Sequence, residues 1–156
     1  MGRISGFLSV PAGDKLRLVL AATLLVVVRI GVFVVPFSTF RRLLLAPATT
    51  LARIVPGSPA PVRIAWTVDA ADRNCPGHRT CLMRSLTAET MHRLYDHAVV
   101  HRIGVDTASD GNDTAAGSGC FQAHSWIEYD GSVLIGHLED LSRFEPLPPL
   151  DEIGGP

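Results

Sequence analysis

Two segments of the sequence carry residue types that could perform nucleophilic catalysis. Cys81 opens the segment Cys81–Leu86, and His124 lies within residues 121–131. A cysteine at the start of a helix has its thiolate favoured by the helix dipole and by free N–H groups. A histidine placed beside such a cysteine can accept the thiol proton. These two residues therefore form a candidate catalytic pair, provided that the fold brings them together.

Each candidate also has a purely structural interpretation. A free cysteine is usually a small buried hydrophobic residue, and an isolated strand histidine usually has no chemical role. Cys81 follows a Pro-Gly loop and Thr80 before it is a suitable N-cap, so the sequence favours a partly exposed helix start. In a strand, His124 and Trp126 share one face, where the indole could shield the imidazole from water. Glu128 lies on that face too, as a solvated strand charge or as a partner of the ring.

The elements around these residues predict an α+β core. Residues 81–95 place apolar side chains near one helical stripe, whereas residues 98–105 and 120–129 have the composition and alternation of strands. Asp130-Gly131 predicts a hairpin turn into a return strand over residues 132–135. The predicted core is thus a helix that carries the cysteine, packed on an antiparallel sheet.

The flanking segments are less regular. Residues 61–68 fit a strand or a helix, and a helix leading toward the cysteine segment is favoured. Residues 106–119 are rich in Gly, Ser, Asp and Thr, which predicts a long solvated loop. The last twenty residues are expected to form a surface tail.

An almost continuous apolar stretch covers residues 16–37, with only two arginines in it. It could be a helix that faces the core or a partner, a membrane contact, or a processed signal. Arg29 would cost roughly 2.5–3.5 kcal/mol inside a membrane span, and Val34-Val35-Pro36 is a poor cleavage site. A second short helix is expected over residues 41–45, ending near Pro47.

Prolines and a glycine between residues 46 and 61 mark the best boundary in the chain. We predict an apolar N-terminal helical segment with a linker over residues 1–60. The catalytic core then covers residues 61–150, and residues 151–156 form a tail.

Composition narrows the function further. A net charge of −1 and 6% aromatic residues do not favour nucleic-acid binding. Three irregularly spaced cysteines are a poor disulfide framework, so we expect a reducing, cytoplasmic compartment, with membrane association through residues 16–37 left open.

No cofactor and no metal are expected. The set formed by Cys75, His78, Cys81 and Cys120 does not have the spacing of a zinc site. Surface roles are expected for the histidines that follow along the helix and strand, which are His92, His97 and His101.

A resemblance adds to these inferences. It rests on Cys81-Leu82-x-Arg84-Ser85-Leu86, on Ile103-Gly104-Val105, and on Phe121-x-Ala123-His124-x-Trp126-x-Glu128 followed by Asp130-Gly131. The apolar stretch ending Val35-Pro36-Phe37 and the downstream Phe144-x-x-Leu147 also fit. With these segments the sequence resembles the leader peptidase (the B2 protein) of lasso-peptide biosynthesis, a compact member of the transglutaminase-like cysteine protease superfamily.

The resemblance implies a papain-like core and a peptidase that removes the leader from a ribosomally made precursor peptide. Cys81 would be the nucleophile, and His124 the general base and then acid. The implied partners are the precursor's leader region, a separate leader-binding recognition protein and an asparagine-synthetase-like lasso cyclase.

The third catalytic residue departs from the family pattern. Relatives place an aspartate about twelve residues after the histidine, where this chain has Gly136. We predict Asp140 in that role, with Glu128 or a backbone carbonyl as alternatives. The oxyanion donor is the Cys81 N–H or the Asn74 side chain.

Two other functions stay open. A catalytically degenerate scaffold or chaperone would hold the precursor or the cyclase through the apolar N-terminal helices, and the missing carboxylate favours it. Amide transfer would use the same residues with an amine in place of water.

Overall fold

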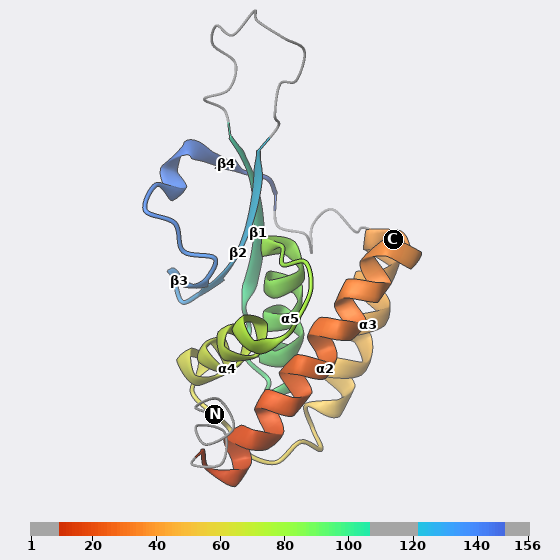
Figure 1. The fold of residues 1–156 in the computed structure, drawn as a ribbon. Coiled ribbons are helices and arrows are strands. Elements are labelled where there is room, and N and C mark those ends of the chain that lie inside the picture. The colour runs from red at the N-terminus through yellow and green to blue at the C-terminus, as the bar shows by residue number, and fades with distance from the viewer. Residues whose placement is uncertain (1–9, 107–121, 149–156) are drawn as a thin grey trace, which may run out of the picture.

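The computed structural model describes residues 10–106 and 122–148, as helices followed by an antiparallel sheet (Figure 1). This arrangement confirms the predicted α+β class with an apolar N-terminal helix. The elements are α2 (Ala12–Val34), α3 (Phe37–Leu51), α4 (Pro61–Asn74), α5 (Cys81–Leu94), β1 (Val100–Asp106), β2 (Ala123–Tyr129), β3 (Ser132–Ile135), the 3₁₀ helix η2 (Leu141–Arg143) and β4 (Phe144–Pro146).

Helix α5 is the central element of the molecule. It begins where the Thr80 side chain accepts the N–H of Met83, as the predicted N-cap should. Ten of its fourteen residues are buried, because the sheet covers one side and α2, α3 and α4 cover the others. Figure 1 shows α5 between the sheet and the pair α2 and α3. The first residue of this central helix is Cys81.

The sheet has the strand order β3-β2-β1-β4, and every neighbouring pair is antiparallel. The turn between β2 and β3 is the predicted hairpin, with φ of 49° at Asp130 and 74° at Gly131. Two successive positive φ values are what a type I′ turn requires, and Asp-Gly supplies them at low cost. The hairpin holds the strand of His124 in the middle of the sheet.

Strand β4 corrects the prediction of a C-terminal surface tail. It pairs with β1 from Asp106↔Phe144 to Gly104↔Pro146, and Phe144 is buried. Three residues are too few for an alternating pattern to be visible in the sequence. Pro146 is tolerated because β4 lies at the sheet edge, where a missing N–H costs no ladder bond.

Helix α3 corrects a second prediction, since it continues past Pro47 to Leu51. A proline inside a helix removes one N–H and usually breaks the helix. Here the chain stays helical, and the hydroxyls of Thr49 and Thr50 donate to the carbonyl of Ala46. The predicted helix at residues 61–68 is confirmed by α4, which has Pro61 in its first turn.

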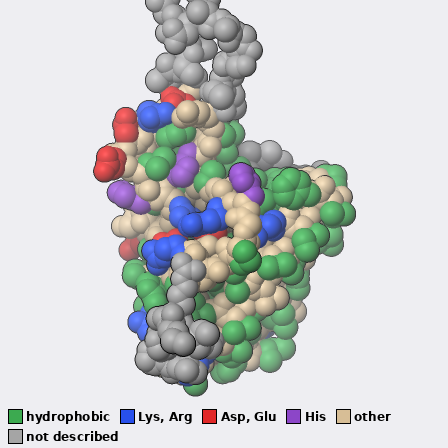
Figure 2. Space-filling view, viewed as in Figure 1, with side chains coloured by type: hydrophobic (Ala, Val, Ile, Leu, Met, Phe, Trp, Pro, Cys, Tyr) green, Lys and Arg blue, Asp and Glu red, His purple; other side chains and the backbone are tan. Residues whose placement is uncertain are grey.

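Helix α2 contributes one face to the hydrophobic core and leaves the other exposed. Ala21 and Leu25 pack in one core cluster with residues of α4, α5 and the sheet, and Val28 packs in a second cluster with α3 and α5. The exposed face, called the α2 stripe below, carries Leu16, Val19, Val26, Val27, Ile30, Phe33 and Val34. Figure 2 shows hydrophobic side chains gathered on the side that α2 and α3 form.

Length and composition would allow α2 to cross a membrane, with a mean hydropathy of 2.3 over 18 residues. The buried core helix of a soluble protein and a signal sequence near an N-terminus meet the same criteria. The core contacts of Ala21, Leu25 and Val28 make α2 a structural part of this fold. The predicted boundary near residue 60 remains a prediction, although the core takes side chains from both sides of it.

Candidate active site

Cys81 is a free, partly exposed thiol at the first position of α5. The Thr80 side chain satisfies the N–H of Met83, and the Thr80 carbonyl accepts the N–H of Arg84. Among the described residues, the N–H of Cys81 has no acceptor. The helix start therefore offers a partly exposed thiol next to a free backbone donor, at the positive end of the helix dipole.

His124 lies near the start of β2 and is half-buried. Its Nε2 is 2.7 Å from the carbonyl oxygen of Gly136. A carbonyl can only accept, so in the neutral ring Nε2 carries the hydrogen and Nδ1 is the basic nitrogen. The ring is thus oriented by the residue twelve positions further along the chain, through its backbone.

Gly136 has a conformation and a setting that only glycine fits. Its φ is +84°, and a Cβ there would lie 2.7 Å from the Ser125 carbonyl oxygen and 2.8 Å from the Trp126 Cβ. An aspartate at this position would be strained and would collide with β2. The usual carboxylate is therefore replaced by the backbone carbonyl of the same residue, one of the alternatives left open by the sequence.

Helix α5, which begins at Cys81, packs against β2 close to Gly136. Ser85 lies one turn after Cys81 and donates from its Oγ to the carbonyl oxygen of Ser125, at 2.9 Å. Residues i and i+4 share a helix face, so Cys81 and Ser85 both lie on the side of α5 that meets this edge. Gly136 packs against the same Ser125 carbonyl and holds His124. The structure thus joins the first turns of α5 to the strand that carries His124, although His124 is not among the residues that line the hollow beside Cys81.

Aromatic side chains cover the imidazole, as the alternation in β2 predicts. The Trp126 ring is stacked on His124 with 6.1 Å between centroids and 15° between planes, and Phe144 lies 5.5 Å away. Gly104 on β1 makes room for both, since a Cβ there would lie within 3 Å of each. Glu128 accepts the indole N–H of Trp126 at 2.7 Å, so it fixes the indole that covers the ring.

The contact described for Asp140 is not with His124. Its side chain is exposed at the start of η2, and its Oδ1 accepts the hydroxyl of Ser142 at 2.6 Å. The ring nitrogen that we expected Asp140 to orient is held by Gly136 in this structure. The sequence held no signal for this, because a backbone carbonyl leaves no mark on residue type.

A buried polar network lies behind the site. Glu89 on α5 accepts from Arg41 on α3, from Arg93 and from His101 Nδ1 at 2.8 Å, and His101 Nε2 lies 2.7 Å from Ser125 Oγ. Serine, histidine and glutamate here have the order of a hydrolase triad. Ser125, His101 and Glu89 are all at least 98% buried, so no substrate reaches this serine.

The burial of two histidines corrects the surface roles predicted for them. His101 belongs to the network just described, and His92 is fully buried between the carbonyls of Ala88 and Pro61. Burial lowers the pKa of His92 and outweighs the two backbone hydrogen bonds, which act in the opposite direction. A polar side chain on the core-facing side of a helix or strand is wrongly predicted to be a surface residue when its hydrogen-bond partners are distant in sequence.

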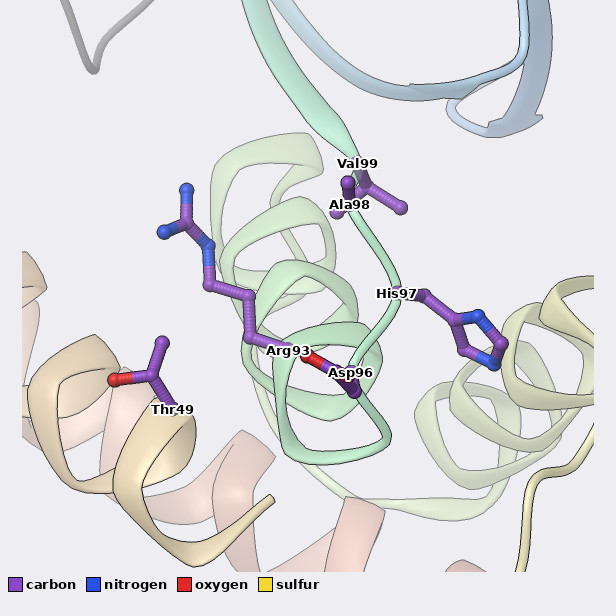
Figure 3. A pocket seen from close by; sticks show the side chains of 6 residues that line it. All are labelled: Thr49, Arg93, Asp96, His97, Ala98 and Val99. Atoms are coloured by element: carbon purple, nitrogen blue, oxygen red, sulfur yellow. The ribbon is translucent and has the colours of Figure 1, made fainter. Parts of the chain in front are cut away.

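Two hollows lie at opposite ends of α5. A cleft of about 270 Å³ is lined by Asp72, Arg79, Thr80, Cys81 and Arg84, beside the candidate nucleophile. A larger cavity of about 370 Å³ lies at the other end of the helix and is lined by Thr49, Arg93, Asp96, His97, Ala98 and Val99 (Figure 3). Arg93 and Thr49 reach toward the gap between α3 and α5, whereas His97 turns toward α4 and donates from its Nε2 to the carbonyl oxygen of Pro59 at 2.8 Å. The larger cavity has no nucleophile, so the smaller cleft is the candidate site.

No three His, Cys, Asp or Glu side chains within residues 10–106 and 122–148 are grouped so that they could hold a metal ion. Cys120, considered in the zinc set, lies outside the described residues.

Comparison with known proteins supplies the family. A family model described as the transglutaminase-like superfamily matches residues 22–148, which is most of the chain. This chain belongs to the transglutaminase-like superfamily. No curated protein and no solved structure matches it.

Membership in the transglutaminase-like superfamily agrees with the α+β architecture and with a cysteine at the start of the central helix. The superfamily includes cysteine proteases and transglutaminases. The match begins within α2 and ends after β4, so the N-terminal helices and the short edge strand are parts of the transglutaminase-like domain.

Proposed function

We propose that this transglutaminase-like protein is a cysteine peptidase that removes the leader from a lasso-peptide precursor. The single observation that carries the catalytic part is the contact between His124 Nε2 and the Gly136 carbonyl, at the edge where Ser85 anchors the cysteine helix. It leaves Nδ1 of His124 unprotonated in the neutral ring, and we propose that this nitrogen is the base for the helix-start thiol of Cys81. The leader-peptidase part rests on the resemblance of the Cys81 and His124 segments.

The chemistry follows from these groups. Nδ1 of His124 takes the proton of Cys81 Sγ, and the thiolate attacks the scissile carbonyl carbon. The C–N bond breaks as the imidazolium gives its proton to the leaving amine, and a thioester remains. Water then attacks the thioester, its proton goes to Nδ1, and the thiolate leaves from the new carboxylic acid.

The oxyanion of each tetrahedral intermediate needs a donor. The free N–H of Cys81 suits this role because it lies at the helix start next to the sulfur. The Asn74 amide is a weaker candidate, since its Nδ2 donates to the Ala70 carbonyl at 2.7 Å. We therefore assign the oxyanion to the backbone of α5.

The scaffold alternative was favoured by the missing carboxylate at position 136. That argument weakens because the Gly136 carbonyl orients His124 in its place. Amide transfer uses the same residues and differs only in the acceptor, which an amine-containing assay would detect.

The test is cleavage of a precursor by the purified protein with its leader-binding protein. Cys81→Ala should abolish cleavage in a mass-spectrometric assay while precursor binding is retained, because only the nucleophile is lost. Cys75→Ala is the matched control and should cleave normally, since Cys75 lies just past the end of α4 and outside the Cys81 cleft. Cleavage by Cys81→Ala at the wild-type rate would contradict the peptidase, and a wild-type protein that binds without cleaving would favour the scaffold.

The α2 stripe is the surface that we propose for the leader-binding partner. It is a continuous apolar helix face without a partner in the described chain, and the resemblance implies a separate protein that presents the leader. Phe33→Ser and Ile30→Ser should weaken co-purification with that protein by about tenfold each, the effect of removing a buried side chain from an interface. Val62→Ser on α4 is an exposed control and should have no effect. Binding of the wild-type protein to lipid vesicles, lost in the α2 variants, would assign the stripe to a membrane instead.

A further inference from the structure

We propose that the cleft beside Cys81 is an anion-accepting subsite, in which Arg84 binds an acidic side chain of the substrate close to the scissile bond. The inference rests on the proposed peptidase function and adds a substrate preference to it. It begins from the five residues that line the cleft, of which two are arginines and one is the nucleophile.

The charges in the cleft are unequally compensated. Arg79 is neutralised by Asp72, with its Nε and a terminal nitrogen both 2.9 Å from the same carboxylate oxygen. Arg84 has a much weaker tie, since its nearest carboxylate oxygen, on Asp69, is 3.6 Å away and both side chains are partly exposed. Exposed pairs at such a distance contribute little. Arg84 is therefore the cation in the cleft that is available to bind an anionic ligand.

Arg84 also has an unsatisfied donor. Its Nε is buried and has no hydrogen-bond partner among the described residues. Burying a guanidinium nitrogen without an acceptor is costly, and a carboxylate is the group that guanidinium binds with paired hydrogen bonds. An acidic substrate side chain would supply the missing acceptor.

The position of Arg84 relates this group to the reacting sulfur. Cys81 and Arg84 are three residues apart on α5, hence neighbours on one helix face, and both line the same cleft. A carboxylate held by Arg84 would thus lie within a residue or two of the carbonyl that Cys81 attacks.

The first experiment needs no substrate. In a Cys75→Ala, Cys120→Ala background, Cys81 is alkylated with iodoacetate and with iodoacetamide, and the ratio of the two rates is measured. Arg84→Gln should lower that ratio roughly three- to tenfold, because one nearby positive charge is lost for the anionic reagent only. Arg84→Lys should keep most of the ratio, and 0.5 M salt should shrink the difference.

The matched control is Arg73→Gln, because Arg73 is exposed in the last turn of α4 and does not line the cleft. It should leave the ratio unchanged. An Arg84→Gln ratio equal to that of the unmodified background would overturn the subsite.

The second experiment tests the substrate assignment. Acetylated, amidated peptides that vary one position at a time around the cleavage site are offered to the protein with its leader-binding partner. Wild type should favour Asp or Glu at one position within two residues of the cut, and Arg84→Glu should shift that preference to Lys or Arg. Cleavage without any acidic preference would overturn the substrate assignment. If no peptide is cleaved, the peptidase function fails, and the alkylation ratio alone decides on the subsite.

Discussion

At the scale of single residues, the candidate site depends on a glycine whose backbone carbonyl takes the place of a side-chain hydrogen-bond acceptor. Gly136 presents its carbonyl to His124 Nε2 and has no room for a Cβ against β2. The orientation of the imidazole and the identity of its basic nitrogen both follow from that contact. Steric crowding therefore requires glycine at position 136. The place of this residue in the chain makes its carbonyl the hydrogen-bond acceptor of His124.

Replacing this glycine should cost stability, because a Cβ would collide with β2, and should also damage the site. Gly136→Ala should slow cleavage roughly tenfold or more, since a displaced carbonyl no longer orients the ring. Gly131→Ala is the matched control, because Gly131 also has a positive φ, of +74°, but no atom within 4 Å of its missing Cβ. It should cost only about 1 kcal/mol of backbone strain and leave cleavage intact. Equal activity of the two variants would argue against the role of Gly136, and stability is checked by urea unfolding.

The sequence allowed prediction of some of these residues and not others, for a physical reason. Cys81 and His124 were predicted because a nucleophile and a base must be particular side chains, and their catalytic roles stay predictions. Asp140 was chosen because the search was for a carboxylate, whereas the ring partner in the structure is a main-chain oxygen. The contact between His124 and the Gly136 carbonyl depends on the path of the chain at the end of β3. The types of the residues involved do not indicate that path.

At the scale of elements, one side-chain hydrogen bond fixes the cysteine helix to the histidine strand. Ser85 Oγ donates to the Ser125 carbonyl, next to His124 in β2. This bond crosses from α5 to the sheet within one turn of Cys81. We expect it to fix where Cys81 lies along the strand.

Ser85→Ala should therefore lower cleavage roughly tenfold while it costs about 1 kcal/mol of stability, the contribution of one hydrogen bond. Thr87→Val is the matched control: Thr87 is equally buried on α5, but its hydroxyl donates to Met83 within the same helix. It should cost a similar stability and leave cleavage near wild type. The comparison uses cleavage rates and thermal unfolding, and equal rates for the two variants would contradict a positioning role for Ser85.

The strong local signals at this scale were sufficient for prediction. The Thr80 cap and the β2–β3 hairpin each involve neighbouring residues, and both were predicted correctly. The helix that was favoured over a strand at residues 61–68 is α4. The extension of α3 through Pro47 and the strand β4 are both set by tertiary contacts, and both were missed. A three-residue edge strand exists only because β1 is there to pair with it.

At the scale of the whole molecule, the Glu89 network joins four elements through one buried carboxylate. Arg41 comes from α3, Glu89 from α5, His101 from β1 and Ser125 from β2. Burial opposes ionisation of Glu89, but the hydrogen bonds and charges of His101 and Arg41 more than offset it. The pKa of Glu89 is therefore held below its ordinary value of 4.5.

A depressed pKa makes stability depend on acid. The contribution of Glu89 is fully present above its unfolded pKa of about 4.5 and is lost as the pH falls through the folded value. Glu89→Gln should cost about 3 kcal/mol near neutral pH, as a broken buried pair does, and should flatten the acid dependence. Asp14 also has a lowered pKa, chiefly because of the hydrogen bond from Arg63. Asp14→Asn is thus the control, and urea unfolding between pH 7 and 3 should show the smaller flattening for it. An unchanged acid slope in Glu89→Gln would contradict the buried pair.

The link from Arg41 to Glu89 has a consequence for anyone who divides this protein. A gene fragment that starts at residue 61 would keep Cys81, His124 and the whole sheet. It would lose Arg41, the partner of the buried Glu89, and it would expose the surface against which α2 and α3 pack. Such a fragment should be recovered as insoluble material. We expect that this transglutaminase-like domain could be grafted onto a foreign recognition module only if the first two helices were transferred with it.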